Sequence, residues 1–134
     1  MFIYLVRGLS GSGKSTAAGN IDAVLLETDM FWPLNGGFNP KRLPEAHEWC
    51  RKEVEGLLND GESVVVANTF STFQEMAPYF ELAKTYGVPI TVLDLYDGGL
   101  SDEELFARNL HGVPLHTIRN MRKRWQHDWS RFKR

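Results

Sequence analysis

Hydrophobic residues form four short runs along the chain, separated by stretches with helical patterns of apolar and polar positions. The runs are rich in β-branched residues and lie at 2–6 (FIYLV), 24–28 (VLLET), 63–68 (SVVVAN) and 90–96 (ITVLDLY). The helical stretches between and after them cover about 16–21, 44–59, 72–86 and 102–110. Strands that alternate with helices in this way predict an α/β fold with a parallel sheet and right-handed crossovers.

Residues at the ends of these stretches support the helix assignments. Pro44 stands near the start of the second helix, and Gly61 follows its end. Ser101, with Glu104 three residues later, predicts a capping box at the start of the fourth helix. A further helix is predicted over 115–126, with an apolar stripe formed by Leu115, Ile118, Met121 and Trp125 and a basic face formed by Arg119, Arg122 and Lys123.

The segment 31–44 (FWPLNGGFNPKRLP) is the one long predicted loop, rich in Gly, Pro and aromatic residues. Structureless loops of this length are usually functional, so we expect it to line a site. In an open α/β sheet the active crevice lies at the carboxyl ends of the strands. The residues at those ends are therefore the candidates for chemistry.

Composition indicates a globular protein of one domain, 1–134. Apolar residues make up 43% of the chain and charged residues 24%, as in ordinary soluble proteins. Cys50 is the single cysteine, which excludes a disulfide framework within the chain and a cysteine-based zinc cluster. Its helical context predicts a buried, inert thiol. No apolar run reaches membrane-spanning length, and we expect a cytoplasmic protein without membrane contact.

The net charge of −2 hides an uneven distribution. Residues 1–107 carry 7 Lys and Arg against 16 Asp and Glu, whereas residues 108–134 carry 8 against 1. The basic segment is either a solvated helix face or an element that closes over polyphosphate bound to the acidic body.

Gly8, Gly13, Lys14 and Ser15 match the phosphate-loop spacing G-x-x-x-x-G-K-[ST] within RGLSGSGKSTAAG. Glycines let the backbone N–H groups converge on phosphate oxygens, and Lys14 supplies a compact charge. The Ser15 hydroxyl is suited to ligate Mg²⁺. A chance Gly/Ser turn is the alternative, but the preceding strand and following helix favour a loop that binds ATP or GTP. Its predicted nucleotide contacts are Gly8, Leu9, Ser10, Gly11, Ser12, Gly13, Lys14, Ser15 and Thr16.

Each of the other strands also ends in polar residues. Asp29, after the second strand, is placed to accept a proton from an attacking hydroxyl or to hold metal-bound water, or else to form an Asx-type turn. The third strand has Ala67 where many phosphate-loop enzymes have an acidic residue that supports Mg²⁺. The uncharged Asn68 and Thr69 follow it. The fourth strand offers Asp94 and Asp97, which are either metal partners or loop and capping residues.

Arg108 lies near the end of its predicted helix, in ELFARNLHGVP. As a surface residue it would satisfy the last carbonyl groups of that helix. As a functional residue it would neutralise charge on a transferring phosphoryl group.

Taken in order, GLSGSGKST, ETDMFW, LPEAHEWC, VVVANTFSTFQEMAPYFELAKTYGVPI and ELFARNLHGVPLHTIRNMRKRW resemble the 5′-hydroxyl polynucleotide kinase-like branch of P-loop kinases and ATPases. That branch includes bacteriophage end-healing kinases and small stand-alone relatives. The resemblance implies a P-loop NTPase-type three-layer sandwich with a small, four-stranded, mainly parallel sheet and a C-terminal helical lid at about 108–126.

The resemblance also implies residue roles. Asp29 takes the position of the general base toward the 5′-hydroxyl, and Arg108 that of the lid arginine. Lys14 and Ser15 carry over as the phosphate and Mg²⁺ contacts. Arg122, in the lid helix, is expected to contact the nucleotide. The predicted substrate contacts are Trp32, Asn68 and Thr69.

The sequence departs from that family at three places. Ala67 replaces an acidic residue, which puts metal support in doubt. Trp32 replaces an arginine that grips the acceptor phosphate, and would stack on a base or simply pack. The lid loop NLHGVP is shorter and lacks a second arginine, and we interpret its His111 as an exposed turn residue.

Two functions follow as hypotheses. The first is an ATP-dependent phosphotransferase that uses Mg²⁺ and transfers the γ-phosphate to a 5′-hydroxyl nucleic acid end or a small nucleotide-like molecule. The second, motivated by Ala67, is a nucleotide-binding module or weak ATPase with decayed catalysis that acts through a partner. The negative charge balance disfavours binding along an extended nucleic acid.

Overall fold

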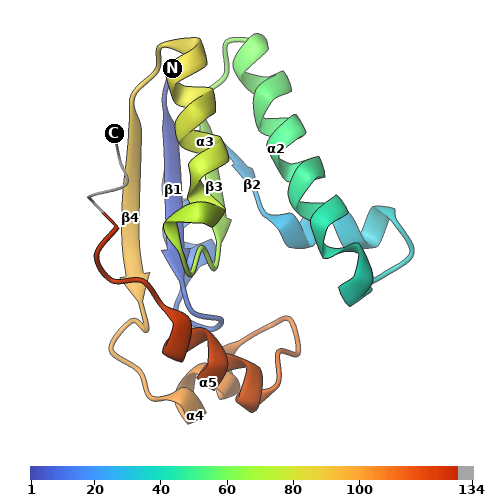
Figure 1. Cartoon of the computed structure of the whole chain (residues 1–134), viewed down its shortest axis with the longest axis vertical. Helices are drawn as coiled ribbons and strands as arrows, with labels where there is room; N and C mark the ends of the chain where they lie inside the picture. Colours follow the sequence, from blue (N-terminus) through green and yellow to red (C-terminus); the bar gives the residue numbers. More distant parts are fainter. Residues whose placement is uncertain (130–134) are drawn as a thin grey trace.

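The computed structural model describes residues 1–129 and contains one parallel four-stranded sheet (Figure 1). The strand order is β2-β3-β1-β4, and every pairing is parallel, so the sheet is parallel throughout rather than mainly parallel. Leu5 of β1 pairs with Val66 on one side and Val92 on the other. The strands are β1 (Ile3–Gly8), β2 (Val24–Leu26), β3 (Val64–Asn68) and β4 (Ile90–Tyr96).

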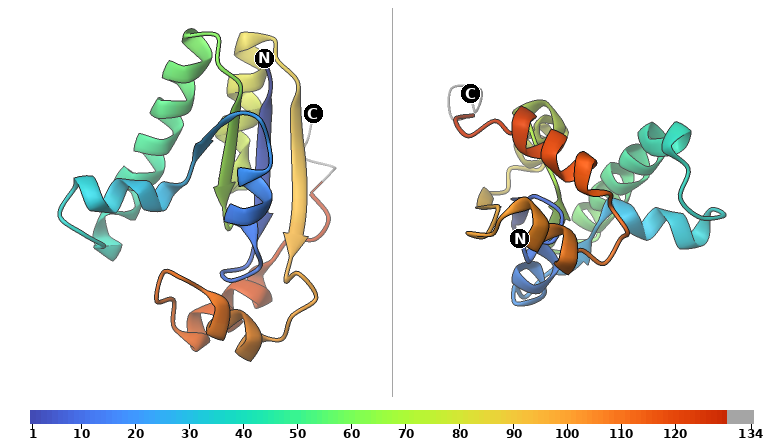
Figure 2. Two further views of the ribbon diagram at one scale, coloured as in Figure 1. Left: turned by 180° about the vertical axis from the view of Figure 1, so that it is seen from behind. Right: turned by 90° about the horizontal axis from the view of Figure 1, so that it is seen from below.

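Helices cover both faces of the sheet and its carboxyl end, which confirms the predicted α/β class. α2 and α3 pack on one face and α1 on the other, whereas α4 and α5 lie where the strands end (Figures 1 and 2). The helices are α1 (Lys14–Gly19), α2 (Leu43–Asn59), α3 (Phe73–Tyr86), α4 (Asp102–Arg108) and α5 (Leu115–Arg124), with short 3-10 helices η1 (Thr28–Leu34) and η2 (Pro40–Arg42).

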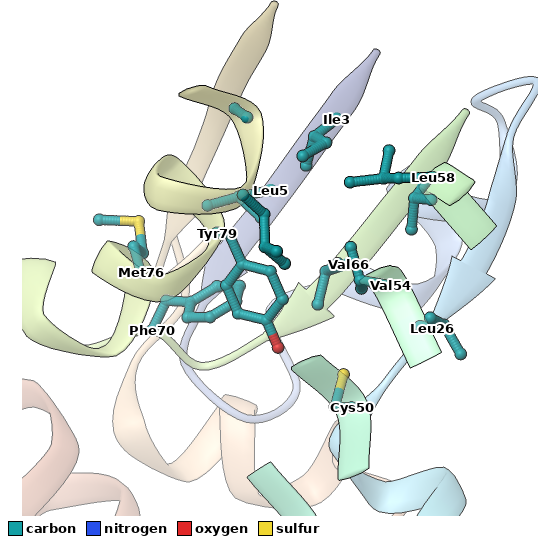
Figure 3. Close-up of a cluster of buried hydrophobic side chains, with 13 residues drawn as sticks. Ile3, Leu5, Leu26, Cys50, Val54, Leu58, Val66, Phe70, Met76 and Tyr79 are labelled. Carbon is teal, nitrogen blue, oxygen red and sulfur yellow. The ribbon is translucent and has the colours of Figure 1, made fainter. Parts of the chain in front are cut away.

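The main core lies between the sheet and the pair α2 and α3 (Figure 3). α2 has a buried stripe with a spacing of four residues, in which Cys50, Val54 and Leu58 join this core and Ala46 packs against Phe31 and Trp32 of η1. This spacing keeps the side chains on one face of a helix, so the sequence pattern itself directs that face to the sheet. Cys50 is buried, as predicted.

The second strand is shorter than predicted, and the loop 31–44 is more ordered. β2 ends at Leu26, and the backbone N–H of Thr28 donates to the side-chain oxygen of Asn68 (2.9 Å) instead of continuing the ladder. The chain then turns into η1, and η2 leads directly into α2. This arrangement places Asp29 in a 3-10 turn just beyond the sheet edge.

The C-terminal helices form a small core of their own behind the phosphate-loop sequence. Leu9, Leu105, Ile118 and Trp125 are buried together there. The predicted capping box is confirmed, because the Glu104 N–H donates to the Ser101 hydroxyl (3.2 Å) and the Ser101 N–H to the Glu104 carboxylate (3.1 Å). The last five residues of the basic segment, 130–134, lie outside the described residues.

The side chain of Arg7, at the end of β1, is fully buried. Its guanidinium donates to four acceptors, namely the carbonyl oxygens of Phe70 (2.9 Å), Ser71 (3.1 Å) and Gln126 (3.0 Å) and the carboxylate of Asp94 (2.9 Å). Burial lowers the pKa of Arg7, and the Asp94 carboxylate opposes that shift. The guanidinium therefore ties the segment after α5 to the central strand.

No helix within residues 1–129 combines the length and apolar character needed to cross a membrane.

Candidate active site

The phosphate-loop sequence forms a tight turn between β1 and α1. Gly11 (φ 85°) and Gly13 (φ 99°) have left-handed backbone conformations, which favour glycine. A Cβ at Gly11 would also collide with the carbonyl oxygen of Leu105. α1 begins at Lys14, so its first N–H groups, which lack acceptors within the helix, face the same space as the loop.

Lys14 occupies the base of this turn. Its ammonium donates to the carbonyl oxygen of Leu9 (3.2 Å). Burial lowers the pKa of Lys14, and the nearby carboxylates of Glu27 and Asp29 oppose that shift. The cation is thus partly dehydrated and faces two carboxylates, and its charge is available to an anion that enters the turn.

Glu27 provides a carboxylate that the sequence analysis did not identify. The Ser15 hydroxyl lies 3.2 Å from both of its carboxylate oxygens. In many phosphate-loop enzymes this group stands at the end of β3, where Ala67 is buried here against Val6 and Ala18. The only hint in the sequence is the position of Glu27 in ETDMFW, directly after the second strand and two residues before Asp29.

Asp29 is the second residue of η1, and its side chain is about half exposed (48%). The indole N–H of Trp32 donates to one carboxylate oxygen (3.3 Å). His111 Nε2 lies 3.5 Å from the other. The side chain of His111 is about half exposed, in agreement with its interpretation as an exposed turn residue. It also faces Asp29, the predicted base, across the cleft.

Trp32 supports Asp29 rather than offering an open stacking surface. Its side chain is buried, and its ring packs edge-on against Phe31 and Phe38. Phe38 is the exposed aromatic residue of this group. A base that enters the cleft would thus meet Phe38 before Trp32.

The end of β3 joins the site through its side chains and backbone. The Asn68 side chain is held by its bond from the Thr28 N–H, while its Nδ2 atom is buried without a hydrogen-bond partner. The carbonyl oxygen of Thr69 accepts from the Gly8 N–H (3.3 Å). Beneath them, the hydroxyl of Tyr79 points toward Cys50 (Figure 3), and burial raises the pKa of the Cys50 thiol.

A short, braced loop follows Arg108, the last residue of α4. The side chain of Asn109 accepts from the Val113 N–H (2.9 Å) and donates to the Phe106 carbonyl oxygen (2.8 Å). This bracing projects Leu110 and His111 toward η1.

Four contacts hold the side chain of Arg122 outside the lining of the cleft. Its guanidinium binds the carboxylates of Asp97 (2.8 Å) and Asp102 (2.7 Å), the hydroxyl of Tyr96 (3.0 Å) and the carbonyl oxygen of Leu100 (3.0 Å). These bonds raise the pKa of Arg122. Arg122 does not line the cleft, and the nucleotide contact predicted for it stays a prediction. Asp97 and Asp94 both pair with arginines in the described structure.

A cleft of about 1550 Å³ joins the predicted residues. This exceeds the roughly 300–1,000 Å³ of a single small-molecule pocket, so it has room for two ligands. Gly8, Leu9, Ser12 and Arg122 do not line it. The predicted residues that do are Ser10, Gly11, Gly13, Lys14, Ser15, Thr16, Asp29, Trp32, Asn68, Thr69 and Arg108.

The donor set around Ser15 suits Mg²⁺. The hydroxyl and the Glu27 carboxylate are hard oxygen groups beside the glycine-rich turn, whose N–H groups and Lys14 are suited to bind an anion. Within residues 1–129 no cluster of three or more His, Cys, Asp or Glu forms a complete metal cage. Magnesium commonly takes one or two protein oxygens and completes its shell with phosphate and water.

Comparisons with known proteins agree with this architecture. A family model described as an AAA domain matches residues 3–127. The fold is similar to a chain of the Pnkp1/Rnl/Hen1 RNA repair complex, with a TM-score of 0.74, 21% identity, and coverage of 93% of this chain and 44% of that one. It is also similar to the APS kinase CysC of Mycobacterium tuberculosis in complex with AMPPNP and APS, with a TM-score of 0.53, 24% identity, and coverage of 70% and 61%.

A gluconokinase from Sinorhizobium meliloti 1021 has a similar fold as well, with a TM-score of 0.56, 18% identity, and coverage of 93% of this chain and 75% of that one. The chain spans less than half the length of the RNA repair protein that it matches. At these identities the likeness shows the fold. The matches confirm the P-loop resemblance indicated by the sequence motifs.

Proposed function

The chain belongs to the AAA domain family of P-loop proteins, and from this premise we propose that it is an ATP-dependent phosphotransferase with a hydroxyl acceptor. Membership of this family implies nucleotide binding. One observation carries the step from binding to transfer: Asp29 and Arg108 line the same cleft as Lys14, although they come from distant parts of the chain.

The proposed chemistry needs little covalent help from the protein. The acceptor oxygen forms a bond to the γ-phosphorus, the bond to the β–γ bridging oxygen breaks, and ADP leaves with that electron pair. Asp29 accepts the hydroxyl proton, while Lys14 and Arg108 neutralise charge on the phosphoryl oxygens. The acceptor predicted from the sequence is a 5′-hydroxyl nucleic acid end or a small nucleotide-like molecule, and GTP is the alternative donor.

Mg²⁺ would be held by the Ser15 hydroxyl with support from Glu27. When bound, the ion supplies neutralising charge to the phosphates of the donor. Glu27 supports the kinase hypothesis, because a carboxylate is present beside Ser15 although position 67 is alanine. The protein would thus not need an acidic residue on β3.

A transfer assay tests the proposal. Purified protein with Mg²⁺ and ATP labelled on the γ-phosphate is expected to label 5′-hydroxyl oligonucleotides or nucleosides, and Lys14→Met is expected to abolish labelling. Calorimetry with ATP on the same preparation separates the alternatives. Tight ATP binding without labelled product from any acceptor would support the nucleotide-binding module, and release of labelled phosphate alone would support the weak ATPase.

Glu27→Gln is expected to weaken Mg²⁺ binding in the nucleotide complex by about 10–100-fold, as loss of a supporting carboxylate does at other metal sites. Mn²⁺ titrations of the ADP complex, followed by electron paramagnetic resonance, measure this directly. Glu62→Gln, at an exposed position that does not line the cleft, is the control. Equal affinity in both variants would contradict the assigned role of Glu27.

A further inference from the structure

Exposed hydrophobic side chains are concentrated on the cleft. Nine large hydrophobic residues are exposed in the described part of the chain, and four of them line this one cleft: Met30, Phe38, Leu43 and Leu110. Phe38 is 66% exposed and Leu110 is 92% exposed. Gathered apolar surface of this kind marks a binding site rather than ordinary surface.

These side chains lie on the two walls that flank Asp29. Met30, Phe38 and Leu43 belong to the wall formed by η1, the following loop and α2, which we call the η1–α2 wall. Leu110 belongs to the braced loop after α4, whose neighbour His111 reaches Asp29. A molecule that brings a hydroxyl to Asp29 would therefore have its body between apolar surfaces.

Within residues 28–59, the one Lys or Arg that lines the cleft is Arg51, and it is paired with a carboxylate. Arg42 donates to the Glu45 carboxylate (2.7 Å) and to the Asn35 carbonyl oxygen (2.8 Å). Arg51 lies 3.6 Å from Glu48, and both line the cleft. A phosphate carried by the acceptor would meet the carboxylates of Glu48 and Asp29 on this wall, and like charges placed together disfavour a ligand.

The cleft-lining arginines without an ion pair in residues 1–129 come from the opposite side. They are Arg108 of α4 and Arg124 of α5, the two helices that pack behind the phosphate loop. Cations are thus concentrated where the donor triphosphate would lie. The cleft thus has a cationic side for the anionic phosphate donor and an apolar side for the acceptor.

Asn68, at the end of β3, brings no charge to the cleft. Because its side-chain oxygen accepts from the Thr28 N–H, its Nδ2 group must face the other way, and that group has no partner. Asn68 lines the cleft. Because that Nδ2 atom is buried, Asn68 adds an uncharged side chain to the cleft rather than an exposed donor.

We infer that the acceptor is an uncharged alcohol that carries an apolar or aromatic ring, with the ring between Phe38 and Leu110 and the reacting hydroxyl at Asp29. The inference rests on the phosphotransferase function proposed above. It narrows the acceptor class, because it excludes a nucleic acid end that is recognised through its own phosphates. The transfer step itself is unchanged.

Thymidine and thymidine 3′-phosphate form a matched pair of probes that differ by one phosphate. Each is titrated into the complex of the protein with Mg²⁺ and AMPPNP, and binding is followed by NMR signals of the Phe38 ring and the Leu110 methyl groups. We expect thymidine to bind at least about tenfold more tightly than its 3′-phosphate. Phe38→Ser is expected to weaken thymidine binding about tenfold, because the ring contact is lost.

Leu34→Ser is the matched control, because Leu34 is 74% exposed on the same η1 element and does not line the cleft. It is expected to bind thymidine as the unaltered protein does. Glu48→Lys adds a cation to the η1–α2 wall and is expected to shift the preference about tenfold toward the 3′-phosphate.

Equal or tighter binding of the 3′-phosphate by the unaltered protein would overturn the inference. So would the absence of thymidine-dependent shifts at Phe38 and Leu110. The amide signals of Gly13 and Lys14 report AMPPNP binding separately. Failure of AMPPNP to bind would overturn the proposed function, whereas AMPPNP binding with the reversed acceptor preference would overturn only the acceptor class.

Discussion

Asp29→Asn is expected to reduce phosphoryl transfer by about 10²–10⁴-fold, the usual contribution of a general base. The amide is isosteric and keeps an oxygen for the Trp32 indole N–H, so η1 is expected to retain its conformation. The amide lacks the basicity to accept a proton from the acceptor hydroxyl. The loss should therefore appear in kcat, measured by steady-state transfer assays, and ATP affinity measured by calorimetry should stay within about twofold.

Asp22→Asn provides the control for this change. Asp22 is exposed, lies before β2 and does not line the cleft, so its variant should transfer phosphate at the unaltered rate. If Asp29→Asn retained more than about a tenth of the activity, the assignment of Asp29 as the base would be wrong. A parallel loss of ATP affinity would instead indicate a role in shaping the phosphate loop.

Arg7→Met is expected to lower the free energy of unfolding by about 3–5 kcal/mol, as removal of one partner of a buried charged network does. Methionine fills similar space but donates no hydrogen bond. The carbonyl oxygens of Phe70, Ser71 and Gln126 would then lose their shared donor, and Asp94 its partner. Urea unfolding followed by tryptophan fluorescence measures the loss.

Two further variants serve as a control and as a second test of the buried network. Arg51→Met removes a half-exposed arginine from a looser pair with Glu48 (3.6 Å) and should cost less than about 1 kcal/mol. Asp94→Asn leaves the three carbonyl contacts of Arg7 intact and should cost about 1–2 kcal/mol even if Arg7→Met does not fold. A loss for Arg7→Met no greater than that for Arg51→Met would show that the buried network does not stabilise the fold.

Local patterns were enough to predict the elements. Alternation of strands and helices gave the α/β class, and the pairing of Ser101 with Glu104 gave a helix start that the structure reproduces. These features depend on residues a few positions apart. The strand order could not be derived in the same way, because it depends on how segments far apart in the chain pair.

Part of the site could be predicted because it, too, depends on residues a few positions apart. The turn around Lys14 follows from a contiguous motif, whereas the carboxylate of Glu27 beside Ser15 becomes visible only when β2 is packed next to α1. The family resemblance, which makes this helix the lid, led us to expect Arg122 at the nucleotide, and that contact stays a prediction. In the structure its guanidinium pairs with Asp97 and Asp102, which precede it by 25 and 20 residues. Charge patterns cannot reveal such long-range neutralisation.

The position of Arg7 also bears on when the chain can finish folding as it leaves the ribosome. Gln126, one of its acceptors, follows it by 119 residues. Until Gln126 has emerged, the guanidinium either stays hydrated or is buried without all of its acceptors. Burial of a charged group without its acceptors costs free energy. The nascent sheet therefore reaches its final stability only after Gln126 has left the ribosome, and shorter nascent chains are more prone to association.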